Sequence, residues 1–260
     1  IASGNYDVQI KVERRDEIGR LAEDFNHMAA EVKRSAQLEK DILANVSHDL
    51  RTPLTLIKGY AETVRDLTGS DDAKRTEQCN IIVDETNRLS TLVNSVMELS
   101  KVQSGAERPN LVDFDMSDLC FEVAGRYDAL CDKNHWQLDL QANEPCPVSA
   151  DPAMMERVMH NLLGNAFHHI GADGVVVLRA IPQEKGCRIE IEDHGPGIPP
   201  EDLENVKTKF YKGSNSVRGS GIGLALVDSI MTALDGTLDI KSTLGRGTVV
   251  TLGLPLYHKA

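Results

Sequence analysis

Apolar residues repeat with a heptad spacing through the first half of the chain, and this repeat constrains the fold more than any other feature. They alternate at three- and four-residue intervals at Leu43, Val46, Leu50, Pro53, Ile57, Tyr60, Val64 and Leu67. A second repeat joins Ile82, Leu89, Val96, Leu92 and Leu99, with Glu85 interrupting it. Such seams predict two long helices, each burying one face.

The stretch from 67 to 72 separates the two repeats. It predicts a turn, because glycine ends helices and serine or aspartate caps the next one. Two antiparallel helices cannot bury both seams alone, so we expect two copies of the chain to form a four-helix bundle. A further helix is predicted upstream, where apolar residues recur at Ile18, Leu21, Phe25, Met28 and Val32.

Residues 45–54, Asn-Val-Ser-His-Asp-Leu-Arg-Thr-Pro-Leu, place polar chemistry on the exposed side of the first repeat. His48 falls at heptad position f, Asp49 at g and Thr52 at c. His48 and Thr52 are therefore neighbours one turn apart on a solvent-exposed face of the helix. A packing histidine would lie on the seam. His48 instead points away from the seam into solvent, and it is either an ordinary solvated residue or a reactive imidazole. Pro53 should bend the helix here.

Composition excludes several classes of function. The 260 residues carry a formal net charge of −12, which argues against nucleic-acid binding and against attraction to anionic lipid. The five cysteines form no Cys-x-x-Cys pair, so we expect reduced thiols and no zinc site of that kind. No apolar run approaches the ~20 residues of a membrane span. The chain opens at Ile1, and we expect it to be a fragment of a longer protein.

After Pro109 and Asn110 the heptads stop, and helical and strand patterns alternate. The candidate strands are 136–141, 175–180, 188–193, 237–242 and 247–254. The candidate helices are 116–131, 152–170 and 221–234. This order predicts an α/β sandwich with helices on one face of a mixed sheet.

Four motifs with ligand-binding chemistry are spread over this region. The first, at 161–169, puts amide oxygens that suit Mg²⁺ on one helix face. The second, at 193–198, ends a strand with a carboxylate that can accept a hydrogen bond from an exocyclic amine. The glycines that follow would let a ligand ring approach the backbone closely. The third, at 219–224, is a glycine-rich loop that can offer backbone N–H groups to phosphate at a helix start. The fourth, at 245–248, reads alone as a hairpin turn.

In this order the motifs resemble those of bacterial sensor histidine kinases of two-component systems. Residues 45–54 match the H-box, 161–169 the N-box, 193–197 the G1 box, 219–224 the G2 box and 245–248 the last glycine box. Residues 1–36 look like the C-terminal part of a HAMP linker. The resemblance implies dimerisation and phosphotransfer helices over 37–105 and a Bergerat-type catalytic ATP-binding domain over 106–260.

The resemblance also implies an activity. His48 would take the γ-phosphate of ATP and pass it to an aspartate of a response-regulator receiver domain. Asp49 would orient the imidazole, and Thr52 would position water when the same surface dephosphorylates the regulator. Because HAMP segments follow membrane helices, we expect a membrane-anchored parent protein and a cytoplasmic location for this segment.

The implied nucleotide site gathers residues from all four motifs and from the basic loop before the third. Its expected members are Asn161, Asn165, His168, His169, Asp193, Gly195, Gly197, Ile198, Lys209, Tyr211, Lys212, Gly219, Ser220, Gly221, Ile222, Gly223, Leu224 and Thr248. Asn165 would bind Mg²⁺ and Asp193 the adenine amine. Two positions depart from the family pattern: His168 replaces a common lysine or arginine, and Lys207 replaces a common phenylalanine.

Two rival interpretations compete with a kinase. One is a dimeric coiled-coil scaffold with a degenerate nucleotide domain, which intact His48, Asn165 and Asp193 argue against. The other is a different Bergerat ATPase, such as a chaperone, which the His48 motif on a separate helix pair argues against.

Overall fold

The computed structural model describes residue 10, residues 17–208, residue 211 and residues 221–256, except for the side chains of residues 17, 31, 34–43 and 45. The chain forms two compact units, residues 1–89 and 90–260. Among the described helices, none combines the length and the apolar character needed to cross a membrane.

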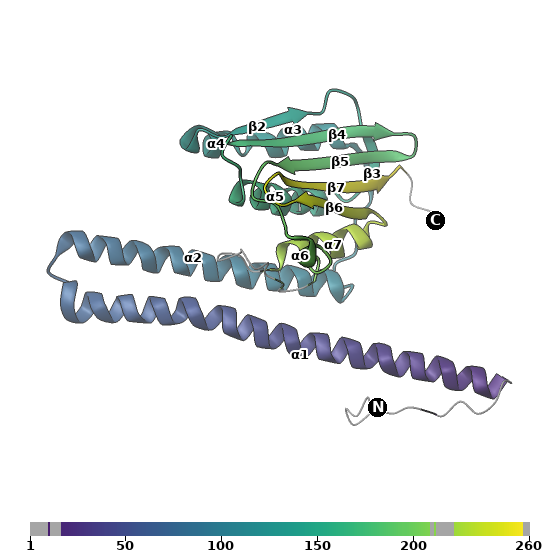
Figure 1. The fold of residues 1–260 in the computed structure, drawn as a ribbon, viewed down its shortest axis with the longest axis horizontal. Helices are drawn as coiled ribbons and strands as arrows, with labels where there is room; N and C mark the ends of the chain where they lie inside the picture. Colours follow the sequence, from purple (N-terminus) through teal and green to yellow (C-terminus); the bar gives the residue numbers. More distant parts are fainter. Residues whose placement is uncertain (1–9, 11–16, 209–210, 212–220, 257–260) are drawn as a thin grey trace. The chain divides into compact units, whose positions relative to one another are not determined.

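The first unit is dominated by long helices (Figure 1). α1 (Glu17–Thr63) joins the predicted upstream helix to the heptad helix without a break, and it runs through Pro53. It continues as a π-helical segment, η1 (Val64–Thr68), before α2 (Asp72–Gln103) begins. The turn therefore starts slightly later than predicted. Asp71 caps α2, since its carboxylate accepts from the Lys74 N–H at 3.2 Å.

The α1 seam is only partly covered within one chain. Pro53 is buried and Val46, Leu50, Ile57, Tyr60 and Val64 are half-buried, whereas Leu67 is 78% exposed. Glu85 is largely covered, and its Oε2 lies 3.7 Å from Arg88 across one helical turn. Part of the apolar seam therefore remains exposed in a single chain.

The second unit contains the predicted α/β sandwich. Its sheet has the strand order β2-β4-β5-β7-β6. The strands are β2 (Gln137–Gln141), β4 (Val175–Gln183), β5 (Gly186–Asp193), β6 (Thr237–Thr243) and β7 (Gly247–Pro255). β2 and β4 are parallel and the other neighbours antiparallel, so the mixed sheet is confirmed. α3, α5 and α7 lie on one face of it (Figure 1).

Four elements differ from the expectation. The predicted helix 116–131 is two helices, α3 (Met116–Gly125) and α4 (Asp128–Asn134), because Arg126 and Tyr127 lie between them outside the helices. The short strands β1 (Val112–Asp115) and β3 (Pro147–Ala150) pair with each other and were not predicted. Helix α6 (Pro200–Leu203) is also new.

The core lies between the sheet and α5 (Pro152–His168), and α7 (Gly223–Ala233) packs beside α5. Asp151 starts α5 by accepting from the N–H groups of Ala153 and Met154 at 3.0 and 3.1 Å, with Pro152 at the first helical position. The buried face of α5 is rich in methionine and leucine. It presents Met154, Met155, Val158, Met159, Leu162, Leu163, Ala166 and Phe167.

Four of the five cysteines are buried in this unit. Burial raises the pKa of the Cys120 thiol to about 12, and nearby Cys146 adds to the effect. Burial also raises the pKa of Cys187, whose thiol is hydrogen-bonded to Cys146. Cys131 is buried too, whereas Cys79 on α2 is exposed.

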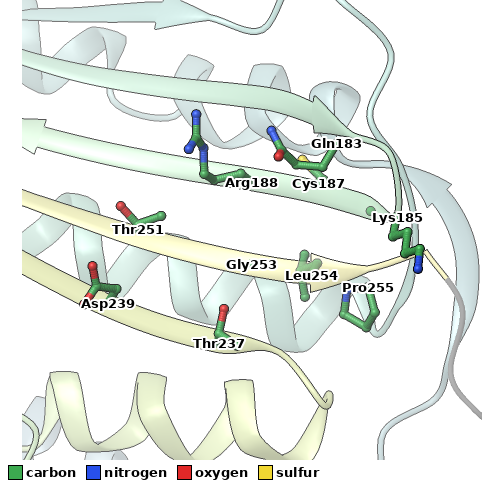
Figure 2. Close-up of a pocket in the computed structure, with 11 residues that line it drawn as sticks. Gln183, Lys185, Cys187, Arg188, Thr237, Asp239, Thr251, Gly253, Leu254 and Pro255 are labelled. Atoms are coloured by element: carbon green, nitrogen blue, oxygen red, sulfur yellow. The ribbon is translucent and has the colours of Figure 1, made fainter.

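The sheet face opposite the helices carries a shallow hollow of about 370 Å³ near the start of β5 (Figure 2). Arg188, Thr251, Thr237 and Asp239 line one part of it, and Lys185 lines its far end beside Pro255. Because Asp193 ends the same strand, the hollow is at the opposite end of β5 from the nucleotide motifs.

Candidate active site

His48 is displayed on α1 as the heptad predicts. Its side chain is 77% exposed, and its Nδ1 lies 3.7 Å from Asp49 Oδ1. This distance suits an ion pair but exceeds a hydrogen bond. Thr52, one turn further along, is exposed on the same helix. An accessible imidazole with a carboxylate beside Nδ1 leaves Nε2 free of that neighbour, as a nucleophile requires.

The N-box and the G2 box meet where α5 and α7 pack together. A Cβ built on Gly223, the first residue of α7, would lie 3.1 Å from Asn161 Oδ1 and 3.8 Å from Asn165 Nδ2. The Asn161 amide is oriented by its Nδ2, which donates to the Arg157 carbonyl at 2.8 Å. Gly223 therefore lets the start of a helix approach two amide side chains closely.

The G1 box and the last glycine box meet across β5 and β7. Asp193 and Thr248 are register partners, and each is 9% exposed. The Asp193 carboxylate accepts from the Gly195 N–H at 2.9 Å and from the Thr248 backbone N–H. Burial raises the pKa of Asp193, and these two donors oppose that shift. Gly247, with φ +116°, has no room for a side chain, because a Cβ would lie 1.9 Å from the Asp193 carbonyl oxygen.

The end of the N-box helix packs directly on the G1 box. A Cβ on Gly195 would lie 1.9 Å from the His169 carbonyl oxygen, and one on Gly171 would lie 2.1 Å from that of His194. His168 and His169 meet edge to face, with ring centroids 4.8 Å apart. Burial, helped by His168, lowers the pKa of His169.

Two features of this site were missed by sequence reasoning. Gly171 is one, and a glycine after a helix gave no signal of its own. The other is Ser242 on β6, whose hydroxyl contacts both Ile198 and Thr248. A lone serine in a strand is uninformative until its partners, 44 residues away in the sequence for Ile198, are brought beside it.

The segment after α6 is partly described. The Tyr211 hydroxyl donates to Asp202, a buried acid that is 5% exposed. Lys207, which departs from the family pattern, donates to the Leu238 carbonyl at the start of β6.

Of the other site residues expected from the sequence, Lys209, Lys212, Gly219 and Ser220 lie outside the described residues. Gly221 has φ +65°, Ile222 is buried, and Gly197 has φ +70° beside the Thr243 carbonyl. Leu224, in the first turn of α7, is half-buried.

The donor set fits a magnesium ion that is shared with phosphate. Within the described ranges, His, Cys, Asp and Glu side chains do not gather in any group of three or more that could hold a metal ion. Mg²⁺ bound with a nucleotide needs only one or two protein oxygens. Asn165 is exposed beside the start of α7 and can supply a hard amide oxygen there.

Three family descriptions match the chain in succession. Residues 1–34 match the HAMP domain, and residues 38–105 match the His Kinase A (phospho-acceptor) domain. Residues 150–258 match the histidine kinase-, DNA gyrase B-, and HSP90-like ATPase. The second match includes His48, and the third includes all four nucleotide motifs.

Curated relatives give the same result. The sensor histidine kinase YclK of Bacillus subtilis is 34% identical over 272 residues, covering 100% of this chain and 57% of YclK. The sensor-like histidine kinase SenX3 of Mycobacterium tuberculosis is 30% identical, covering 94% of this chain and 60% of SenX3. The chain thus spans less than two thirds of the length of these relatives.

Solved structures share the fold. The histidine kinase AdeS of Acinetobacter baumannii is 26% identical with a TM-score of 0.64, covering 81% of this chain and 98% of AdeS. Full-length ShkA in complex with AMPPNP is 25% identical with a TM-score of 0.62, covering 84% of this chain and 46% of ShkA. The motifs, the mixed sheet and these matches agree: the chain belongs to the sensor histidine kinases of bacterial two-component systems.

Proposed function

We propose that this protein autophosphorylates His48 from ATP and transfers the phosphoryl group to an aspartate of a response regulator. The observation that carries the proposal is the 77% exposure of His48 with Asp49 beside Nδ1, in a chain whose second unit has an ATPase fold. Asp49 favours the tautomer with the proton on Nδ1, so Nε2 keeps the lone pair that attacks phosphorus. Phosphoryl transfer then depends mainly on in-line placement and charge neutralisation.

We propose the nucleotide site to consist of the residues expected from the four motifs, with Asn165 holding Mg²⁺. The Asp193 carboxylate, fixed by Gly195 N–H, would accept the adenine amine. Gly223 places the start of α7 beside Asn161 and Asn165, where the phosphates and their cation would lie. The bound cation would neutralise charge on the phosphates.

The finer organisation belongs to the same proposal. Residues 1–36 would end a HAMP linker, 37–105 would dimerise and carry His48, and 106–260 would bind ATP. The partly exposed α1 seam supports a homodimer. The HAMP match supports a membrane-anchored parent protein with this segment on the cytoplasmic side. Thr52, exposed one turn from His48, supports a second activity, dephosphorylation of the regulator.

The test is incubation with γ-labelled ATP and Mg²⁺. We expect label that is lost in acid and stable in alkali, as a phosphoramidate is. His48→Gln should remove the label while leaving ADP binding intact. His27→Gln is the matched control, because His27 is exposed on the same helix, and it should label as the wild type does. Label that persists in His48→Gln would overturn the assignment.

A further inference from the structure

The hydroxyl of Ser242 lies at the junction of three backbone segments of the nucleotide site. The Ile198 N–H, directly after the G1 box, donates to Ser242 Oγ at 2.8 Å. Ser242 Oγ donates to the Gly247 carbonyl, also at 2.8 Å. It lies 2.9 Å from Thr248 Oγ1. One side chain of β6 therefore contacts both the loop after β5 and the start of β7.

Counting hydrogens decides the direction of the last contact. A serine hydroxyl has one hydrogen to donate and two lone pairs that accept. The Gly247 carbonyl can only accept, so it takes the Ser242 hydrogen. The Ile198 N–H can only donate, so it occupies one lone pair. The contact with Thr248 must then use the hydrogen of Thr248 and the second lone pair of Ser242.

We infer that Ser242 is a specificity-determining positioning residue, which consumes the only hydrogen of the Thr248 hydroxyl and leaves that hydroxyl as an acceptor toward the nucleobase. Thr248 and Asp193 are register partners, and both are nearly buried. The carboxylate accepts and the hydroxyl accepts, so the two side chains offer no donor to a base. Ser242 itself need not touch the nucleotide.

An acceptor-only edge selects one class of base. An amino-purine such as adenine presents an exocyclic amine, which donates to such an edge directly or through water. An oxo-purine such as hypoxanthine presents a carbonyl at the same place, so acceptor would face acceptor. Leaving a buried polar group without a hydrogen-bond partner costs more free energy than a good hydrogen bond gains. The site should therefore discriminate strongly between amino- and oxo-purines. This inference rests on the proposed function, because it places the base beside Asp193.

Removal of the Ser242 hydroxyl should change selectivity as well as affinity. In Ser242→Ala the Thr248 hydrogen is released, and the Thr248 hydroxyl becomes free to donate to a carbonyl on the base. Ser242→Thr keeps one hydrogen and two lone pairs at the same place. Ser117→Ala is the matched control, since Ser117 is buried and its hydroxyl donates to the Glu144 carbonyl at 2.7 Å, away from the nucleotide motifs.

The experiment is calorimetric titration of the full chain with ADP and with inosine diphosphate. We expect the preference for ADP to fall by at least ~fivefold in Ser242→Ala, to return in Ser242→Thr, and to stay at the wild-type value in Ser117→Ala. If Ser242→Ala weakens both ligands equally, the role is merely structural and the inference is overturned. A wild type that prefers ADP but does not label His48 overturns the kinase proposal alone, because binding is measured without phosphotransfer.

Discussion

Replacement of Gly223 by alanine should weaken nucleotide binding without unfolding the protein. The new Cβ would lie 3.1 Å from Asn161 Oδ1, tighter than ordinary van der Waals contact. Asn161 can retreat only by loosening its 2.8 Å bond to the Arg157 carbonyl, which is worth about 1 kcal/mol. Alanine is better than glycine by about 1 kcal/mol in a helix interior, and at Gly223, the first residue of α7, by no more than that. The two effects offset each other in the free energy of unfolding.

In nucleotide binding, by contrast, the helix propensity of alanine does not compensate for the displaced amide. Displacing the Asn161 amide by a few tenths of an ångström should cost roughly one hydrogen bond or ligand contact, so ADP affinity should fall about tenfold. Calorimetric titration with ADP and Mg²⁺ gives the affinity, and urea unfolding gives the stability.

Gly164→Ala is the matched control for Gly223→Ala. Gly164 lies in the interior of α5, beside Asn165 in the sequence, but a Cβ there meets nothing within 4 Å. This variant should gain about 0.5–1 kcal/mol of stability and keep the wild-type affinity. If Gly223→Ala binds ADP as tightly as Gly164→Ala does, the close approach of α7 to the Asn161 amide does not contribute to binding.

Three further predictions concern other parts of the chain. Thr52→Ala should leave autophosphorylation intact but slow dephosphorylation of a phospho-regulator by at least ~tenfold; equal rates in a chase assay would refute this. Asp173 raises the pKa of His194, so their ion pair should stabilise the fold fully below the unfolded histidine pKa of about 6.5 and lose that contribution as pH rises through the raised pKa. His194→Gln should therefore lower Tm at pH 6 and leave it unchanged at alkaline pH, and a deficit that is constant with pH would contradict the pairing. Phe167→Ala should cost about 3–5 kcal/mol in urea unfolding, since the ring is 4% exposed and stacks on Tyr127 and Trp136; a loss under about 1 kcal/mol would be inconsistent with that packing.

The elements that could be predicted from the sequence are those in which apolar residues recur with a clear helical or strand period. The heptads gave both long helices, and five alternating or apolar runs gave the five strands of the main sheet. β1 and β3 are four residues each, and β3 begins with proline, so neither carries enough pattern to be seen. The break between α3 and α4 has no Pro inside it and only Gly125 before it, so the apolar pattern ran on through it.

The candidate nucleotide site could be proposed from the sequence to the extent that it is built from contiguous motifs. Asp193, Asn161 and Gly223 stand within short segments whose residue types carry chemistry locally. Ser242 does not, because its importance comes from contacts that only the antiparallel pairing of β6 with β7 creates.

The five thiols fall into one exposed and four buried residues, so their reactivity can report on the two units separately. Cys79 is the exposed member of the five and lies on α2, so a maleimide dye should attach there alone while the protein is folded. The other four thiols are shielded in the second unit and should react only when that unit opens. Labelling stoichiometry would then follow unfolding of the ATP-binding unit without any engineered residue, and a dye on Cys79 would report separately on the helical hairpin.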